Sequence, residues 1–460
     1  MQVSHKVSVV FDEANLVSSA GLVPALGLAR RAGLHDLLTG RVSVPGPAGA
    51  NVAVKVTSLV AAMLAGADCI EDTGVLRHGG MGRLLGDGRA ATTLGTHLRA
   101  YRFGHVRQLD AVAARFLNGL AGQAPGLVAG GGQRCFVDVD DTMRETHGYA
   151  KQGVAYGYCK VKGLNAQLAV LSGGSAAPVI AGVRLRRGNI ASAHGAARLV
   201  GDALATARRA GVCGQVTVRA DSAYYGHALV AAAGKGGALF SVTARMDPQI
   251  ARAIAAIDEA AWVGIKYPQA IFDEQQQRWI SDAQVAEVPY TAFTSRRKAE
   301  HVTGRLIVRR VKRLGPEHVP AGQGELFTAW RHHVVFTNSQ QPMLAAEAEH
   351  RDHAIVEQVI ADLKDGPLAH LPSGVFTANA AWTVIATMAF NLTRAVGVLA
   401  STRHARARGA TIRRQLINLP ARIARSARRI RLHLPQHWPW QEPFTRLYTA
   451  ACGPPVAVAD

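Results

Sequence analysis

The sequence predicts a mixed α/β fold: a five-stranded sheet with flanking helices, a helical domain before it, and a mostly β insertion within it. Residues 18–120 repeat apolar side chains at intervals of three and four, which is typical of helices. Residues 135–243 then alternate between strand-like and helix-like segments. A chain of 460 residues, 48% of them hydrophobic, is also too long for one ordinary core, which predicts several domains.

The first 130 residues are predicted to form a helical domain. The helix-like segments are LVPALGLARRAGLHDLL, VAVKVTSLVAAMLAGA and HVRQLDAVAARFLNGLAG. A glycine-rich link, residues 130–132, follows the last of them. Because glycine-rich stretches commonly form flexible linkers, we place a domain boundary there.

The next segment, 131–246, follows the order β-β-β-α-β-α-β. CFVDVDD, LNAQLAVLS and APVIAGVRLRR read as three strands, and a helix over 192–210 follows, with Ser192 as its N-cap and Gly211 as its stop signal. QVTVRAD, HALVAAAGKG and ALFSVTA complete the series. Three strands without intervening helices exclude a plain doubly wound nucleotide-binding fold. This order is expected of an RNase H-like sheet.

The remaining segments differ in character. Residues 247–340 are polar and aromatic and predict a β-rich insertion, after which helices over 345–363 and 378–400 complete the core. The second helix is apolar, but it contains Asn391 and Arg394, which favours a buried helix over a membrane span. The segment 401–460 is rich in arginine, and ARIARSARRIRLHL predicts a basic amphipathic helix that contacts DNA or another protomer.

The charge indicates a polyanionic partner. The formal net charge is +20 and the pI is near 10.4, and nucleic acid is the commonest partner of such a surface. A cationic surface that binds nothing in particular is the alternative. The five cysteines are scattered without C-x-x-C spacing, which argues against a disulfide framework and a zinc site. With no apolar signal-peptide core near the N-terminus, we expect a soluble cytoplasmic protein and no membrane partner.

Three dispersed acids are candidate metal ligands. Asp138 and Asp140 share one face of the strand CFVDVDD, and Asp221 ends the strand QVTVRAD. Ligands of open α/β sheets gather at the carboxyl ends of strands, so Asp140 and Asp221 would meet if these strands are parallel neighbours. Glu357, on a helix, would complete an oxygen-only site suited to Mg²⁺ or Mn²⁺. Taken singly, each acid could instead be a turn cap or a surface residue.

Four segments carry a resemblance to a known family: VDVDDTMRETHG, RLRRGN, RADSAYYG and EQVIADLKDGPLAHLPSG. They resemble DDE transposases of bacterial insertion sequences, in particular insertion-sequence family thirteen-eighty, whose third acid lies in a Y-x2-R-x3-E-x6-K signature. Glu357 and Lys364 fit the last two positions of the signature. The tyrosine and arginine positions fall on His350 and His353, so the chain departs from the pattern there, and Arg351 is out of register.

The resemblance implies the roles of the acids. Asp140, Asp221 and Glu357 would be the catalytic residues and would bind two Mg²⁺ (or Mn²⁺) ions. Asp138 and Asp141 are rivals for the first position, although Asp141 points to the opposite face of the strand. The implied activity is cut-and-paste transposition: water attacks at each terminal inverted repeat, and the freed 3′-hydroxyl attacks target DNA. The partners would be double-stranded DNA and, in the DNA complex, a second protomer.

The resemblance also implies DNA contacts. Lys364 lies two helical turns after Glu357 and could hold a phosphate, although such a pair is often an ordinary surface pair. If the element ends pass through a hairpin, a flipped base needs an aromatic partner, and Trp262, Trp279 and Trp330 are candidates, with ordinary packing as the alternative. The full set of expected DNA-binding residues is Lys364, Arg351, His353, Arg413, Arg414, Arg425, Arg428 and Arg429. A nuclease that only hydrolyses and an inactive DNA-binding descendant remain as other readings.

Overall fold

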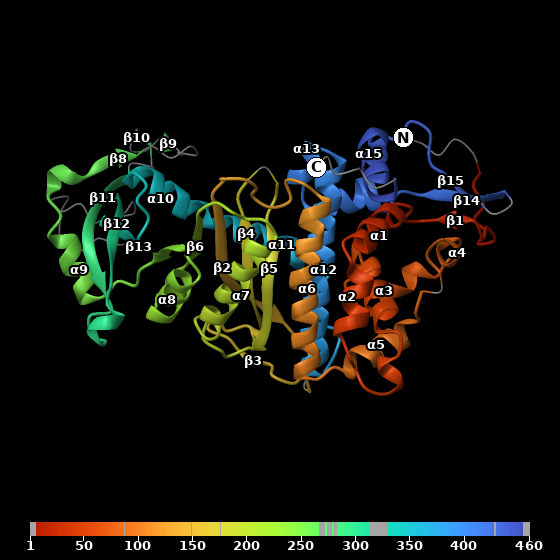
Figure 1. Ribbon diagram of the computed structural model, residues 1–460, viewed down its shortest axis with the longest axis horizontal. Helices are drawn as coiled ribbons and strands as arrows, with labels where there is room; N and C mark the ends of the chain where they lie inside the picture. Colours follow the sequence, from red (N-terminus) through yellow and green to blue (C-terminus); the bar gives the residue numbers. More distant parts are fainter. Residues whose placement is uncertain are drawn as a thin grey trace.

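The computed structural model describes residues 6–453, except residues 87, 149, 175, 266–271, 274–277, 280–282, 313–329 and 427–428. The molecule is elongated, with the N-terminal helices and the C-terminal segment at one end, a large mixed sheet in the middle, and the insertion at the other end (Figure 1). The protein is therefore of the mixed α/β class, as predicted.

The middle of the sheet has the predicted order of elements, with one additional short strand, β3, which pairs with β4. β2 pairs with β4 antiparallel and with β6 parallel, β4 pairs with β5 antiparallel, and β6 pairs with β7 parallel. The helix after β5 begins at Ala196, after Gly195, so Ser192 is not its N-cap; it ends before Gly211, as predicted. The elements are β2 (Cys135–Glu145), β3 (Ala155–Tyr156), β4 (Lys162–Ser172), β5 (Val179–Arg187), α7 (Ala196–Arg209), β6 (Val216–Ala220), α8 (His227–Lys235) and β7 (Leu239–Thr243).

The insertion continues this sheet, so the expectation of a sheet with only five strands was wrong. Its last strand, β13, pairs antiparallel with β7, and β12, β11 and β8 follow in order. Within the described residues the sheet thus has ten strands. The rings of Phe240 and Phe336, whose centroids lie 4.9 Å apart, pack against each other at the junction between β7 and β13. The insertion contains α9 (Pro248–Ala255), β8 (Val263–Ile265), β9 (Phe272–Asp273), β10 (Arg278–Trp279), β11 (Ala283–Ala292), β12 (Val302–Lys312) and β13 (Trp330–Thr337).

The predicted helix over 345–363 is interrupted. It forms α10 (Met343–Arg351), a 3-10 turn (Asp352–Ala354) and α11 (Ile355–Lys364). The turn brings His353 to Asp138 on β2, with 3.1 Å between His353 Nδ1 and Asp138 Oδ1. A tertiary contact therefore overrides the helical pattern at this point.

A long buried helix, α12 (Phe376–Ala400), joins the sheet to the helical end. It packs against β5, α6 and α3, and Figure 1 shows it beside α6 between the sheet and the N-terminal helices. It is long and apolar enough to cross a membrane, but 83% of its most apolar window is buried inside the protein, as the sequence predicted. The N-terminal helices are α1 (Leu22–Arg31), α2 (Leu34–Arg41), α3 (Val52–Ala65), α4 (Met81–Leu85), α5 (Ala91–Arg99) and α6 (Phe103–Gln123).

The prediction of a basic helix over ARIARSARRIRLHL was wrong. The segment forms a hairpin of β14 and β15, and β14 also pairs with β1. Ala421 and Ile423 are buried whereas Arg422 between them is exposed, an alternation that suits a strand with one buried face. The C-terminal segment contains α13 (Thr402–Arg406), α14 (Gly409–Ile412), a π-helical turn (Arg413–Ile417), β14 (Ala421–Ser426), β15 (Arg429–His433) and α15 (Gln441–Cys452), and β1 is Leu16–Val17.

Candidate active site

The parallel pairing of β2 and β6 brings two of the predicted acids together. Val139 on β2 lies opposite Ala220 on β6, so the next residues, Asp140 and Asp221, follow at the same edge of the sheet. This is the neighbouring, parallel arrangement on which the predicted site depended. Two carboxylates from separate parts of the chain therefore stand side by side where the parallel pairing ends, Asp140 in the middle of β2 and Asp221 directly after β6.

Both carboxylates are in surroundings that disfavour a negative charge. Burial raises the pKa of Asp140 to about 6; the backbone N–H of Asp141 and the charge of His353 oppose this rise, and the charge of Asp221 adds to it. Burial also raises the pKa of Asp221, against a hydrogen bond of 3.0 Å from the backbone N–H of Ala223. Asp221 thus caps the turn that follows it and still adds charge at this edge. A cation bound there would offset the cost of both charges.

The carboxylate of Asp138, the rival for the first catalytic position, accepts hydrogen bonds from other side chains of the protein. Its side chain is fully buried. Oδ1 accepts from Arg219 Nε at 2.6 Å and from His353 Nδ1 at 3.1 Å, and Oδ2 accepts from Ser172 Oγ at 2.6 Å and Arg219 Nη2 at 2.9 Å. Burial alone would raise the pKa of Asp138, but the bonds from His353 and Arg219 outweigh it and hold the pKa below its usual value.

Asp141, the other rival, lies on the opposite face, as predicted. Its carboxylate pairs with Arg186 Nη2 at 2.5 Å. Arg186 also donates to Asn165 and to the backbone carbonyls of Ser192 and His194. Asp141 is therefore part of an ion pair that joins β2 to β5.

The third predicted acid lies on α11. Buried Val356, Val359 and Leu363 face inward on this helix, which contacts β2 and β4, whereas Glu357 and Lys364 are exposed. The pKa of Lys364 is lowered, first by burial and then by Arg144, and the charge of Asp140 opposes the shift. Lys364 is thus within electrostatic reach of Asp140, on the helix that also carries Glu357.

Two histidines, at the signature positions where the chain departs from the pattern, lie between these elements. His350 is buried; Ser241 Oγ and Thr243 Oγ1 each lie 2.9 Å from one of its ring nitrogens, and burial lowers its pKa to about 3. His353 stacks near it, with ring centroids 6.4 Å apart. His353 lowers the pKa of both Asp140 and Asp221. The sequence signal for this role was the register of His353 with the arginine of the signature.

Among the described residues, the predicted DNA-contacting arginines lie at different places in the fold. Arg351 pairs with Glu347, with 2.9 Å between Nε and Oε2, and Arg413 lies against Gly66 in the helical end. Arg414 and Arg425 are exposed. Arg428 and the side chain of Arg429 lie outside the described residues.

Two of the predicted stacking tryptophans enclose an arginine. The Arg310 guanidinium lies 4.1 Å from the Trp262 ring centroid and 4.5 Å from that of Trp330, and it pairs with Glu259. One face of each ring is therefore covered by a cation of the same chain. The side chain of Trp279 lies outside the described residues.

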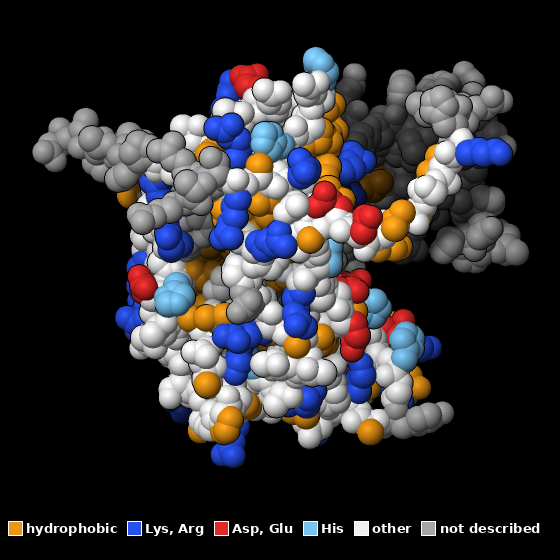
Figure 2. Space-filling model, turned by 90° about the vertical axis from the view of Figure 1, so that its right-hand side faces the viewer, with side chains coloured by type: hydrophobic (Ala, Val, Ile, Leu, Met, Phe, Trp, Pro, Cys, Tyr) orange, Lys and Arg blue, Asp and Glu red, His pale blue; other side chains and the backbone are white. Residues whose placement is uncertain are grey.

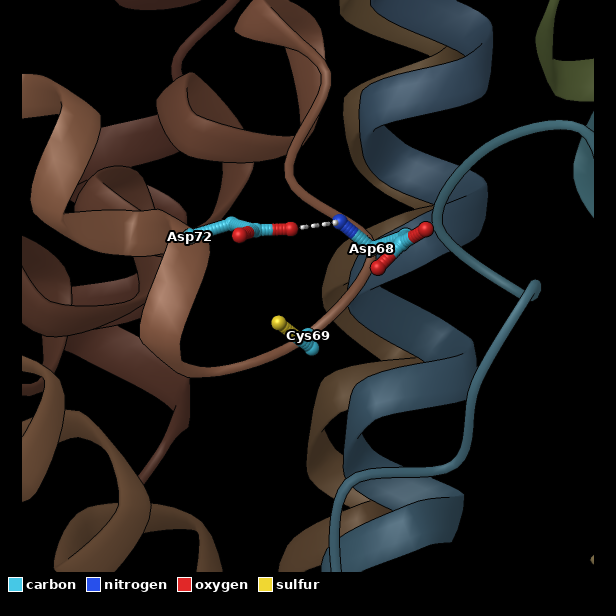
Figure 3. Close-up of side chains that lie close together, drawn as sticks. All are labelled: Asp68, Cys69 and Asp72. Atoms are coloured by element: carbon cyan, nitrogen blue, oxygen red, sulfur yellow. Dashed lines mark hydrogen bonds between the residues drawn. The ribbon is translucent and has the colours of Figure 1, made fainter.

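A separate cluster of ligand-type side chains lies on the loop after α3. Asp68, Cys69 and Asp72 each offer a ligand atom within 4.8 Å of the others. Figure 3 shows the Asp72 carboxylate turned toward the backbone N–H of Asp68, at 3.5 Å, rather than toward Cys69. Asp68 Oδ1 lies 3.1 Å from His370 Nδ1. These contacts belong to a loop cap and a surface pair, away from β2 and β6.

Three comparisons with known proteins gave different outcomes, and one of them identifies a family. No curated protein matches the sequence. Among solved structures, the piggyBac transposase in a synaptic complex with hairpin DNA is similar, with a TM-score of 0.42 and 8% identity over 85% of this chain and 78% of that one. The family model described as transposase DDE domain group 1 matches residues 1–451. Since the match covers nearly the whole sequence, the chain belongs to the group 1 DDE transposase family.

Proposed function

We propose that the protein is a metal-dependent DNA transposase with an RNase H-like catalytic core, in which Asp140, Asp221 and Glu357 hold two Mg²⁺ (or Mn²⁺) ions. The register between β2 and β6 carries the proposal, because it sets Asp140 beside Asp221. Burial raises the pKa of both carboxyls, as expected of ligands that need a cation. Their oxygen-only donors suit hard divalent ions.

The residues of the site would have separate roles in the proposed reaction. When bound, the ions would supply activation of the attacking oxygen and stabilisation of the leaving oxygen. Lys364, within electrostatic reach of Asp140, would hold the phosphate next to the acids as a point charge. Asp221 is oriented by its cap bond to Ala223, so its second oxygen can face the site.

The reaction would be cleavage at terminal inverted repeats followed by strand transfer into target DNA, with two protomers pairing the two ends. The basic end of the molecule would bind the repeats: Figure 2 shows lysine and arginine side chains spread over the face of the N-terminal helices and the C-terminal hairpin. Residues 1–130 and the segment 401–460 would act together there, because β1 and β14 pair in one small sheet. The working location would be the cytoplasm, on chromosomal DNA of a bacterial cell.

The insertion, residues 247–340, would contact the DNA close to the cleavage position. If a hairpin forms at the element end, Trp262 or Trp330 would stack a flipped base after Arg310, which lies against both rings, moves away. Trp279 is the third candidate. Sizing the products of cleavage under denaturing conditions separates a hairpin from a simple nick.

Cleavage of DNA carrying the element's own terminal repeats tests this function. With Mg²⁺, the wild type should cleave the ends and join them to target DNA, whereas Asp221→Ala and Glu357→Ala should bind the DNA without cleaving it. Glu145→Ala is the matched control, since Glu145 is an exposed acid at the far end of β2. Unchanged cleavage by Asp221→Ala would refute the site, and cleavage without joined products would indicate a nuclease that only hydrolyses.

A further inference from the structure

We propose that Asp138 is a positioning residue: together with Arg219 it ties the α10–α11 junction to β2 and β6, and so sets where Glu357 stands relative to Asp140 and Asp221. The inference rests on the proposed metal site. It assigns to a buried carboxylate, two residues from Asp140, a role other than binding metal.

Asp138 has no free lone pair with which to bind an ion. A carboxylate offers about four lone-pair directions, two on each oxygen. Arg219 Nε and His353 Nδ1 fill those of Oδ1, and Ser172 Oγ and Arg219 Nη2 fill those of Oδ2. Asp140, by contrast, accepts a hydrogen bond from the backbone N–H of Asp141 at 2.7 Å and none from a charged side chain within the described residues. Of the two acids on this face, Asp140 is the one that can bind metal.

Arg219 connects the two strands to the junction. It lies directly opposite Asp138 in the β2–β6 register, and its guanidinium sits 4.0 Å from the Phe136 ring centroid. Its Nη1 donates to the backbone carbonyl of Glu349, in the last turn of α10. The same buried cation therefore holds β2, β6 and the end of α10.

His353 makes the second connection. It lies in the 3-10 turn between α10 and α11, and a carboxylate can only accept, so its Nδ1 donates to Asp138. Glu357 follows four residues later, about one helical turn along the chain. With Asp138 anchoring both His353 and the Arg219 contact to Glu349, the start of α11 is fixed from two points. The position of Glu357 is thus set by Asp138 without any contact between the two carboxylates.

Binding of Mn²⁺ to the full-length protein, followed by electron paramagnetic resonance of the free ion, tests the inference without measuring catalysis. Asp138→Asn keeps the shape and removes the charge. We expect its Mn²⁺ affinity to fall by roughly 10- to 100-fold, the usual effect of losing a residue that orients ligands. Asp140→Ala should abolish binding at the site. Asp110→Ala, which removes one of the two carboxylates that pair with the remote Arg107 and Arg184 and leaves Asp202 in place, should leave the affinity unchanged.

A double-variant cycle shows whether the effect passes through α11. If Asp138 acts by placing Glu357, Asp138→Asn should weaken Mn²⁺ binding in the wild type but cause no further loss in a Glu357→Gln background. If Asp138→Asn does not fold, Asp138→Asn with Arg219→Met removes both buried charges together, which is better tolerated than removing one. This pair should show the same loss of affinity and the same dependence on Glu357.

Three results would overturn the inference: a folded Asp138→Asn with unchanged Mn²⁺ affinity, a loss as complete as that of Asp140→Ala, or additive losses in the cycle. The first would make Asp138 purely structural and the second would make it a ligand. A wild type that binds Mn²⁺ but does not cleave end DNA would refute the transposase activity and leave the positioning role standing. A wild type that binds no Mn²⁺ would refute both.

Discussion

Asp138 and Asp140 lie two residues apart on one face of the same strand, but their surroundings have opposite effects on a negative charge. Asp138 receives four hydrogen bonds, two of them from a buried guanidinium. Burial raises the pKa of Asp140 to about 6, with only partial opposition from a backbone N–H and His353. Negative charge therefore stabilises the fold at the first position and destabilises it at the second.

Neutralising these two aspartates should change stability in opposite directions. The folded pKa of Asp140 lies above its ordinary value of 3.8, so its contribution to stability is lost as pH rises through about 6. Without metal at pH 7.5, Asp140→Asn should raise the free energy of unfolding by roughly 1–3 kcal/mol. Asp138→Asn should lower it by about 3–5 kcal/mol, because Arg219 is left buried and unpaired. Urea denaturation in EDTA measures both, and equal signs would contradict this account.

The sequence could predict Asp221 without a rival but could not choose between Asp138 and Asp140. Strand periodicity places both on the same face, and only the tertiary partners separate them. Those partners, Arg219 and His353, lie 81 and 215 residues away from Asp138. Local sequence pattern contains no information about contacts at such separations. Glu357 remains a prediction, supported by its place on α11 beside β2.

At the scale of elements, His350 links α10 to β7. Both ring nitrogens are bonded, to Ser241 and Thr243, which lie on β7. A protonated ring would carry an uncompensated charge in this buried place, and burial therefore lowers the pKa to about 3. Protonation of His350 would therefore weaken the contact that holds the helix pair to the sheet.

Acid should weaken this link. The folded pKa of His350 is below the unfolded value of 6.5, so the unfolded state binds more protons between pH 6.5 and 3, and stability falls as pH drops through that window. Relative to His350→Gln, the wild type should lose about 1.4 kcal/mol per pH unit below pH 6. Urea midpoints at pH 7.5, 6 and 5 measure this difference. His147→Gln, an exposed histidine, serves as the control, and parallel pH profiles for wild type and His350→Gln would refute the assignment.

The elements also show where periodicity misleads. The strands and helices of residues 135–243 were predictable because their apolar spacing fits one period each. The segment 421–434 was not, since Ile423, Ile430 and Leu434 suit a helical face, whereas Ile430, Leu432 and Leu434 also alternate as in a strand. Its pairing with β1, some 400 residues earlier in the chain, decided the outcome. The extension of the sheet by β13 could not be predicted for a similar reason. No local sequence pattern indicates that β7 is the neighbour of β13.

For the whole molecule, the two ends of the chain share one core. α15 packs on α1 and α12, and Leu416, Ile417 and Leu447 are buried. Truncation after Ala400 should therefore expose the N-terminal helices and give an insoluble or protease-sensitive product. Leu447→Ala should cost about 2–5 kcal/mol, measured by thermal unfolding, whereas Arg422→Ala at an exposed site should change stability by less than about 0.5 kcal/mol. A stable, soluble 1–400 product would contradict a shared core.

The net charge of +20 makes the proposed DNA binding strongly dependent on salt. The logarithm of the binding constant should fall linearly with the logarithm of salt concentration, with a slope set by the number of phosphates contacted. Arg414 and Arg425 are exposed on the basic end. If both contact phosphate, the variant Arg414→Ala with Arg425→Ala should reduce the magnitude of the slope by about 2, as measured by fluorescence anisotropy. An unchanged slope would show that these two arginines do not contact DNA phosphates.

The tie between Asp138 and His353 also joins parts of the chain that are synthesised at different times. During synthesis, β2 leaves the ribosome long before the α10–α11 junction, whose His353 follows Asp138 by 215 residues. At about 5–20 residues per second this delay is on the order of 10–40 s, during which Asp138 and Arg219 lack the rest of their network. An unfinished chain therefore cannot place α11 beside β2, and under the proposed function a premature termination product lacking α11 would not cleave DNA.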